Sequence, residues 1–264
     1  MKTVLITGSS SGIGKACVDL FAQKGWNVAA TMRHPVADSR DNVLVLPLDV
    51  TDKKSIHAAV KKAEERFSAI DVLVNNAGYG QIGAMESMSD KQMRDIFETN
   101  VFGVMNVTNE ILPHMRERNE GVIINMSSMI GLISTPLSGY NCATKHALES
   151  ISESLWHELS ITKVRIKVIE PSFTKTNFQT KGMVRGEIKV PLYEEYIENK
   201  WNNVQKYHNA DSPEQVAEVV YQAAIDETPK LRYTCGKRAQ KELFYWKIMP
   251  DSMFLRYINK RFKR

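Results

Sequence analysis

The chain has 264 residues, of which 43% are apolar and 25% are charged, and this balance excludes a disordered or fibrous protein. It shows no run of eighteen apolar residues, no signal-peptide pattern and no C-x-x-C pair among its three cysteines, so we expect a cytoplasmic protein without disulfides or a bound metal. The net charge of +5 arises at the end of the chain, where residues 230–264 carry eleven basic and two acidic side chains. Residues 1–229 carry 24 basic and 28 acidic side chains. Because this larger part of the chain is slightly acidic, we expect no nucleic-acid binding.

Apolar runs of strand length alternate with amphipathic runs of helix length through residue 171. This alternation predicts an α/β fold, with a parallel sheet covered by helices on both faces, in a single domain over residues 1–264. The expected strands are Thr3–Thr7, Trp26–Met32, Val43–Leu48, Val72–Asn75, Val122–Ser127 and Arg165–Glu170. The expected helices are Lys15–Lys24, Lys53–Phe67, Lys91–Leu112 and Cys142–Ser160, with Thr51 or Asp52 and Ser89 as N-caps.

A glycine-rich turn follows the first expected strand. The stretch VLITGSSSGIG, residues 4–14, places Gly8, Gly12 and Gly14 between that strand and the first helix. Glycines permit a tight turn and a close approach of the backbone to a pyrophosphate, which then binds at the positive end of the helix. The position of the turn, directly after an apolar strand, favours a nucleotide site over a purely structural role.

The spacing T-G-x-x-x-G-x-G in this turn resembles the short-chain dehydrogenase/reductase family. Matching motifs follow in the family's order: LDV with Asp49, NNAG at 75–78, TNVFG with Asn100, Ser127-Ser128 before Gly131, CATK with Lys145 and PSFTKT at 171–176. The chain is similar in particular to the branch of hydroxysteroid- and retinol-dehydrogenase-like enzymes. The resemblance implies a doubly wound Rossmann-like domain, a homodimer or homotetramer, and a nicotinamide cofactor.

By this resemblance, one set of residues contacts the cofactor. Its members are Gly8, Ser10, Ser11, Gly12, Ile13, Gly14, Asp49, Val50, Asn76, Ala77, Gly78, Lys145, Pro171, Phe173, Thr174 and Thr176. The end of the second strand, AATMRHP, is expected to distinguish the two nicotinamide cofactors. An acid there accepts a hydrogen bond from a ribose 2′-hydroxyl, whereas a guanidinium pairs with a 2′-phosphate. The stretch holds Arg33 and no acid, so it predicts NADP(H) in preference to NAD(H).

The resemblance also implies four catalytic roles: a Tyr that acts as the acid, a Lys one helical turn later, a Ser that fixes the carbonyl oxygen and an Asn that positions a water. Asn100, Ser128 and Lys145 match three of them. Two residues four apart on a helix lie about 40° from one another, and two residues five apart lie about 140° apart, so Asn141 and not Tyr140 shares a face with Lys145. The family's separation of thirteen residues, counted from Ser128, also ends at position 141. We therefore interpret Asn141 as occupying the position of the Tyr.

An Asn amide has no titrating proton near neutral pH, so Asn141 predicts a protein that binds the cofactor and reduces poorly. Three explanations remain: a deliberate substitution, a natural member that lost or changed its chemistry, and rescue by Tyr140 through an irregular helix start. An engineered or inactivated enzyme ranks first and rescue by Tyr140 last.

Two segments fall outside the regular series. Residues 177–210 mix Gly, Pro, Asn and aromatic residues, which is typical of a substrate lid, and Ser212-Pro213 then starts another helix. The tail, residues 236–264, interleaves aromatic and basic side chains. We expect a helical flap packed on the domain or on a partner subunit, and the alternative is an amphipathic helix that lies on an anionic membrane surface.

These expectations together describe an NADP(H)-dependent oxidoreductase that interconverts an alcohol and a carbonyl on a small hydrophobic substrate, impaired by Asn141. The alternative is a non-redox protein on the same fold that binds a cofactor or associates with a membrane.

Overall fold

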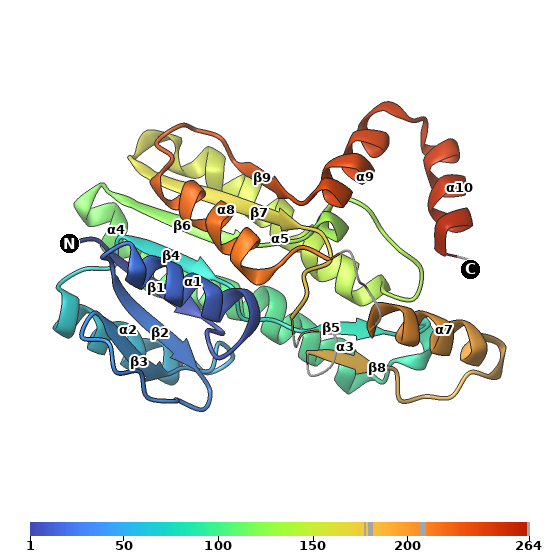
Figure 1. Cartoon of the computed structure of the whole chain (residues 1–264), viewed down its shortest axis with the longest axis horizontal. Coiled ribbons are helices and arrows are strands. Elements are labelled where there is room, and N and C mark those ends of the chain that lie inside the picture. Colours follow the sequence, from blue (N-terminus) through green and yellow to red (C-terminus); the bar gives the residue numbers. More distant parts are fainter. Residues whose placement is uncertain (177, 179–181, 206–209, 263–264) are drawn as a thin grey trace.

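The computed structural model describes residues 1–176, 178, 182–205 and 210–262, and its central feature is a parallel sheet of seven strands (Figure 1). The strand order is β3-β2-β1-β4-β6-β7-β9. The order reverses direction next to β1, which is the arrangement of a doubly wound sheet with its ligand crevice at the carboxyl ends of the strands. The predicted α/β, Rossmann-like fold is confirmed.

The strands lie close to where the apolar runs predict them. Their bounds are β1 Thr3–Thr7, β2 Asn27–Met32, β3 Val43–Pro47, β4 Val72–Asn75, β6 Gly121–Met126, β7 Val164–Pro171 and β9 Arg232–Cys235. The sequence analysis did not predict β9, because its four residues RYTC show no apolar run. It pairs with β7 and forms one edge of the sheet.

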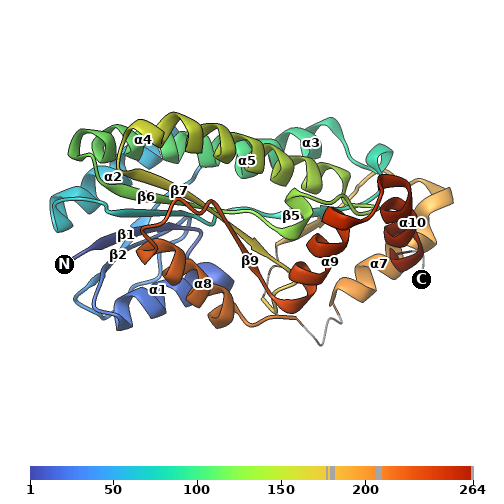
Figure 2. The ribbon, with the colours of Figure 1, turned by 90° about the horizontal axis from the view of Figure 1, so that it is seen from above.

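Helices cover both faces of the sheet, and the alternation of side chains along each strand divides the core in two. On one face, α1 (Gly12–Gln23) and α8 (Pro213–Ile225) cover the apolar side chains of Val4 and Ile6. On the other face, α2 (Lys53–Phe67), α4 (Gly103–Arg118) and α5 (Gly139–Glu158) cover Leu5. Figure 2 shows the sheet between these two helical layers.

The helix predicted over residues 91–112 is divided into three segments. α3 (Asp90–Phe97) starts at a capping box made by Ser89 and Gln92, a π-helical turn follows over Glu98–Phe102, and α4 continues to Arg118. A π turn inserts one residue into the helical repeat and is frequent at functional sites. The predicted site residue Asn100 lies in this turn.

The predicted lid contains regular structure in its described part. β8 (Met183–Arg185) pairs with β5 (Gly80–Ile82), and α7 spans Glu194–Gln205. The sequence analysis predicted neither β8 nor α7 in this segment; positions 177, 179–181 and 206–209 lie outside the described residues. In Figure 1 the β5–β8 pair and α7 lie beyond the carboxyl ends of the central strands.

The tail folds into two helices, α9 (Lys237–Ile248) and α10 (Asp251–Phe262). Leu243, Phe254 and Ile258 pack against Ile133, which follows β6. The helical flap predicted for the tail therefore packs on the domain with part of its apolar side chains. In the part of the chain that the structure describes, no helix combines the length and the apolar character that crossing a membrane requires.

Candidate active site

A cavity of about 710 Å³ opens at the carboxyl ends of the central strands. It is lined by most of the residues that the sequence predicts for the site: Gly8, Ser10, Ser11, Gly12, Ile13, Arg33, Asp49, Val50, Asn76, Ala77, Gly78, Ser128, Asn141, Lys145, Pro171, Phe173, Thr174 and Thr176. Gly14 and Asn100 are predicted site residues that do not line it. The fold thus brings segments from the first 180 residues to one cavity.

The turn between β1 and α1 has the backbone that its glycines permit. Gly8 and Gly12 adopt φ values of +66° and +56°, in the left-handed region that favours glycine. The Ser11 side chain makes no capping hydrogen bond to a described residue, so it leaves the first N–H groups of α1 to another acceptor. The amide of Asn76 donates to the carbonyl oxygens of Thr7 (2.9 Å) and Gly8 (3.0 Å) and holds the turn against β4.

Gly14 lies beneath this turn, where a side chain would clash with the Gly8 carbonyl and the Asn76 amide. Gly14→Ala is expected to lower the free energy of unfolding by about 1–3 kcal/mol, because a close-packed site must shift to admit the methyl group. Urea unfolding measures this. Gly25→Asn is the control, since a Cβ atom added at Gly25 would meet no other atom within 4 Å and Asn tolerates its φ of +79°. Equal stability of Gly14→Ala and the parent protein would contradict the packing role.

Arg33 and Asp49 line the cavity next to the ends of β2 and β3. Burial alone would raise the pKa of Asp49, but hydrogen bonds from Thr51 and the positive charge of Arg33 lower it below its ordinary value. Asp38, the next acid after Arg33, does not line the cavity; it pairs with Arg40, whose Nε lies 2.8 Å from its carboxylate. Arg33 is therefore the charged side chain that the second strand presents to the cavity.

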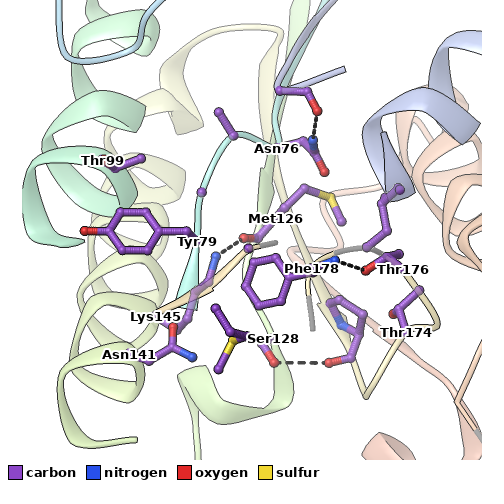
Figure 3. A pocket seen from close by; sticks show the side chains of 18 of the residues that line it. Asn76, Tyr79, Thr99, Met126, Ser128, Asn141, Lys145, Thr174, Thr176 and Phe178 are labelled. Carbon is purple, nitrogen blue, oxygen red and sulfur yellow. Dashed lines mark hydrogen bonds between the residues drawn. The ribbon is translucent and has the colours of Figure 1, made fainter. Parts of the chain in front are cut away.

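Asn141 and Lys145 lie one turn apart on α5 and both face the cavity (Figure 3). Asn141 is 7% exposed. Tyr140 is not among the described residues that line the cavity. The helix begins at Gly139, three residues earlier than predicted, so positions 140 and 141 already follow regular helical spacing.

Lys145 donates a hydrogen bond of 2.7 Å from Nζ to the carbonyl oxygen of Met126, at the end of β6. Burial lowers the pKa of Lys145 to about 8, although the nearby charge of Glu149 acts in the opposite direction. A cation that is this weakly hydrated interacts strongly with any polar group beside it. Lys145 thus places a hydrogen-bonded ammonium group in the wall of the cavity.

Ser128 follows β6 and lines the same cavity as Asn141, with its hydroxyl directed towards the end of β7 (Figure 3). Its hydroxyl donates to the carbonyl oxygen of Pro171 (3.2 Å), which ends β7, and accepts from the backbone N–H of Ile130 (3.4 Å). Neighbouring Ser127 is buried, and its Oγ lacks a hydrogen-bond partner among the described residues. Both serines line the cavity, and Ser128 is the more exposed of the two.

Asn100 lies behind the cavity wall, where it bonds to the backbone of the residue that directly follows the NNAG segment. Its Oδ1 accepts from the N–H of Tyr79 (3.0 Å), and its Nδ2 donates to the Tyr79 carbonyl (2.8 Å) and to the Thr144 hydroxyl (3.3 Å). Asn100 is 1% exposed, so it connects the strand end to α5 without reaching the cavity surface.

Several lining residues have no counterpart in the predicted site. They are mainly apolar side chains and lid residues: Tyr79, Ile82, Met126, Met129, Thr135, Ser138, Phe178, Met183, Val184 and Lys200. The lining residues between positions 178 and 200 belong to a stretch without clear periodicity, so no local pattern in the sequence distinguishes them. Burial and Asp95 raise the pKa of Tyr79 to about 12, and its hydroxyl lies away from Ser128 in Figure 3.

The sequence and the fold are both similar to those of known oxidoreductases. A family model described as short chain dehydrogenase matches residues 2–183. An uncharacterized oxidoreductase of Schizosaccharomyces pombe is 39% identical over 234 residues, which cover 85% of this chain and 96% of the relative. A short-chain dehydrogenase from Streptomyces avermitilis has a similar structure, with a TM-score of 0.86 and 33% identity over 99% of this chain and 96% of that one. A 3-ketoacyl-(acyl-carrier-protein) reductase from Brucella melitensis complexed with NADH gives a TM-score of 0.75 and 27% identity over 90% and 98% of the two chains.

Proposed function

The chain belongs to the short-chain dehydrogenase family, and we propose that it is an oxidoreductase scaffold for alcohol and carbonyl interconversion on a hydrophobic substrate, with NADP(H) preferred and Asn141 in place of the general acid. The observation that carries this proposal is the common cavity, which joins the glycine turn and Arg33 to Ser128, Asn141 and Lys145. The proposal treats residues 1–264 as one domain.

The residues present fit a nicotinamide dinucleotide. The left-handed glycines and the uncapped start of α1 suit a pyrophosphate, and Arg33 suits a 2′-phosphate. The hydroxyls of Thr174 and Thr176 line the cavity from the segment after β7. A bound nicotinamide cofactor supplies or accepts the hydride.

Side chains of the protein would orient the substrate and transfer the proton. Ser128 is expected to hold the carbonyl oxygen, and Asn141 can donate a second hydrogen bond to it. Lys145 holds polar groups of the cofactor. A proton donor with a titrating hydrogen is missing at position 141, and we therefore expect slow reduction despite cofactor binding.

The cavity walls near Asn141 favour an apolar substrate. Ile82 and Met129 are 1% and 2% exposed, and Phe178 and Met183 approach from the lid. Burial of apolar substrate surface against such walls contributes about 25 cal/mol per Å².

Arg33→Ala is expected to weaken NADPH binding by about tenfold and to leave NADH binding unchanged. A tenfold effect is at the low end of what a hydrogen bond to a charged group contributes, because Arg33 is exposed to solvent. Fluorescence titration with each cofactor measures the two affinities. Arg40→Ala is the matched control, since Arg40 pairs with Asp38 and Asp19 and does not line the cavity. If Arg33→Ala and the parent protein bind NADPH equally, the preference assigned to Arg33 is wrong.

Turnover is tested by following NADPH absorbance with a panel of ketones and aldehydes, in the parent protein and in the Asn141→Tyr variant. Reduction of a hydrophobic carbonyl compound in either form supports the proposal. Tight NADPH binding without turnover in both forms would contradict it and support a non-redox binding protein.

A further inference from the structure

Asp211 supports the part of the cavity wall that follows β7. It directly precedes Ser212, the N-cap of α8, and it does not line the cavity itself. Its carboxylate accepts a hydrogen bond of 2.6 Å from the hydroxyl of Ser172, which directly follows β7 and does line the cavity. A hydrogen bond of this length to an ionised oxygen is one of the stronger kinds in proteins. Asp211 is thus joined to the cavity wall through Ser172.

The backbone of Asp211 is bonded to the same segment. Its N–H donates to the carbonyl oxygen of Phe173 (3.0 Å), and its carbonyl oxygen accepts from the N–H of Lys175 (2.8 Å). These bonds form a parallel bridge between Thr174 and Asp211. Asp211 therefore holds residues 172–175 with both its side chain and its main chain.

The end of β9 packs against this hydrogen bond. The N–H of Ser172 donates to the carbonyl oxygen of Cys235 (3.2 Å), which ends β9. A Cβ atom added at the next residue, Gly236, would clash with the Asp211 carboxylate and lie 2.9 Å from the Ser172 hydroxyl. Because protein interiors are close-packed, this contact leaves the two side chains little room to separate.

The strand order places residues 172–175 on the nicotinamide side of the proposed cofactor site. The turn after β1 suits the pyrophosphate, and Arg33, which suits the 2′-phosphate, follows β2 on one side of β1. β7 lies on the other side of β1. The two halves of a dinucleotide extend in opposite directions from the pyrophosphate, so the nicotinamide ring would lie towards Ser172.

We propose that Asp211 is a positioning residue for the nicotinamide ring, which it serves by fixing residues 172–175 through Ser172. This inference rests on the proposed oxidoreductase function, because it requires a bound nicotinamide dinucleotide. A segment that is already fixed loses little conformational freedom when the ring binds against it. Loss of the hydrogen bond from Ser172 to Asp211 frees the segment and weakens binding of the ring, while the contacts of the pyrophosphate and of Arg33 remain.

The test uses the full chain and measures binding of NADP⁺ and of 2′-phospho-ADP-ribose, which lacks only the nicotinamide ring, by calorimetric titration. Asp211→Ala and Ser172→Ala are each expected to weaken NADP⁺ binding by about 5- to 10-fold and to leave 2′-phospho-ADP-ribose binding unchanged. The double variant is expected to bind NADP⁺ no more weakly than either single variant, because all three lose the same hydrogen bond. Glu214→Ala is the matched control, since it removes an exposed carboxylate from the first turn of α8 that does not line the cavity.

The inference is overturned if both single variants bind NADP⁺ as tightly as the parent protein, or if both ligands weaken equally in them. Equal weakening would show that Asp211 only supports the fold, and additive losses in the double variant would show that the two side chains act separately. If Asp211→Ala does not fold, Ser172→Ala decides the inference with the same two ligands. Absence of NADP⁺ binding in the parent protein would contradict the proposed function as well, whereas the other adverse results contradict this inference alone.

Discussion

Asn141→Tyr is expected to raise the rate of NADPH oxidation with a carbonyl substrate by about 10²–10⁴-fold, the usual contribution of general acid catalysis. Asn141 faces the cavity one turn before Lys145, so a phenol at this position would lie beside the ammonium (Figure 3). The positive charge favours the phenolate and lowers the pKa of the phenol towards neutral pH. Stopped-flow or steady-state absorbance measures the rate.

Two control variants isolate the role of the hydroxyl. Asn141→Phe adds a ring of similar size without a titrating proton and is expected to give no gain in rate. Tyr140→Phe removes the neighbouring hydroxyl, which does not line the cavity, and is expected to leave any activity of the parent protein unchanged. A gain in Asn141→Phe equal to that in Asn141→Tyr, or loss of parent activity in Tyr140→Phe, would contradict the assignment.

Arg232→Met is expected to lower the free energy of unfolding at pH 7 by about 2–3 kcal/mol. Arg232 on β9 pairs with Glu149 (3.0 Å) on α5 and with Glu170 (3.6 Å) on β7, whose side chains are 5% and 1% exposed. Removing the guanidinium leaves the two buried carboxylates without this ion-pair partner. Such a loss lowers the free energy of unfolding by about 3–5 kcal/mol when the ion pair is fully buried. Arg232 is 34% exposed, so solvent screening reduces the effect.

The loss in the free energy of unfolding that Arg232→Met causes is expected to become smaller as the pH falls from 7 towards 4.5. Burial, together with the charge of Glu149, already raises the pKa of Glu170 above its ordinary value of 4.5, although a hydrogen bond from Thr234 opposes this. A group whose pKa is higher in the folded state stabilises the fold below its unfolded pKa and loses that contribution as the pH rises through the folded value. Urea unfolding at pH 5 and pH 7.5 measures the difference.

Glu153→Gln is the matched control for this ion-pair cluster. Glu153 contacts the same guanidinium at 2.6 Å, but its side chain is 52% exposed. Its loss is expected to change the stability at pH 7 by about 0–1 kcal/mol, as for surface ion pairs. An equal effect of Arg232→Met and Glu153→Gln, or a deficit of Arg232→Met that does not depend on pH, would contradict the role of the buried carboxylates.

Local patterns predicted most of the regular structure. The 15 residues of α2 match the predicted helix Lys53–Phe67. Of the two predicted N-caps, Thr51 and Asp52, the structure shows Asp52, whose side chain accepts a hydrogen bond from the nearby backbone N–H of Lys54 and needs no partner distant in sequence. Apolar runs predicted the six central strands to within about two residues. The glycine turn could also be predicted from the sequence, because glycine is the residue type that readily adopts the positive φ values of Gly8 and Gly12.

Local sequence patterns were therefore sufficient for the fold class, the nucleotide turn and the spacing that puts Asn141 and Lys145 on one helical face. The other features depend on the tertiary structure. It set the π turn at Asn100, whose amide bonds to Tyr79 and Thr144, and it revealed β9, whose Arg232 meets Glu149 across 83 residues. It also placed Lys200 of α7 against Pro136 and Ser138. These contacts join residues that are distant along the chain, and periodicity and propensity describe only neighbours, so packing alone determines which distant side chains share a site.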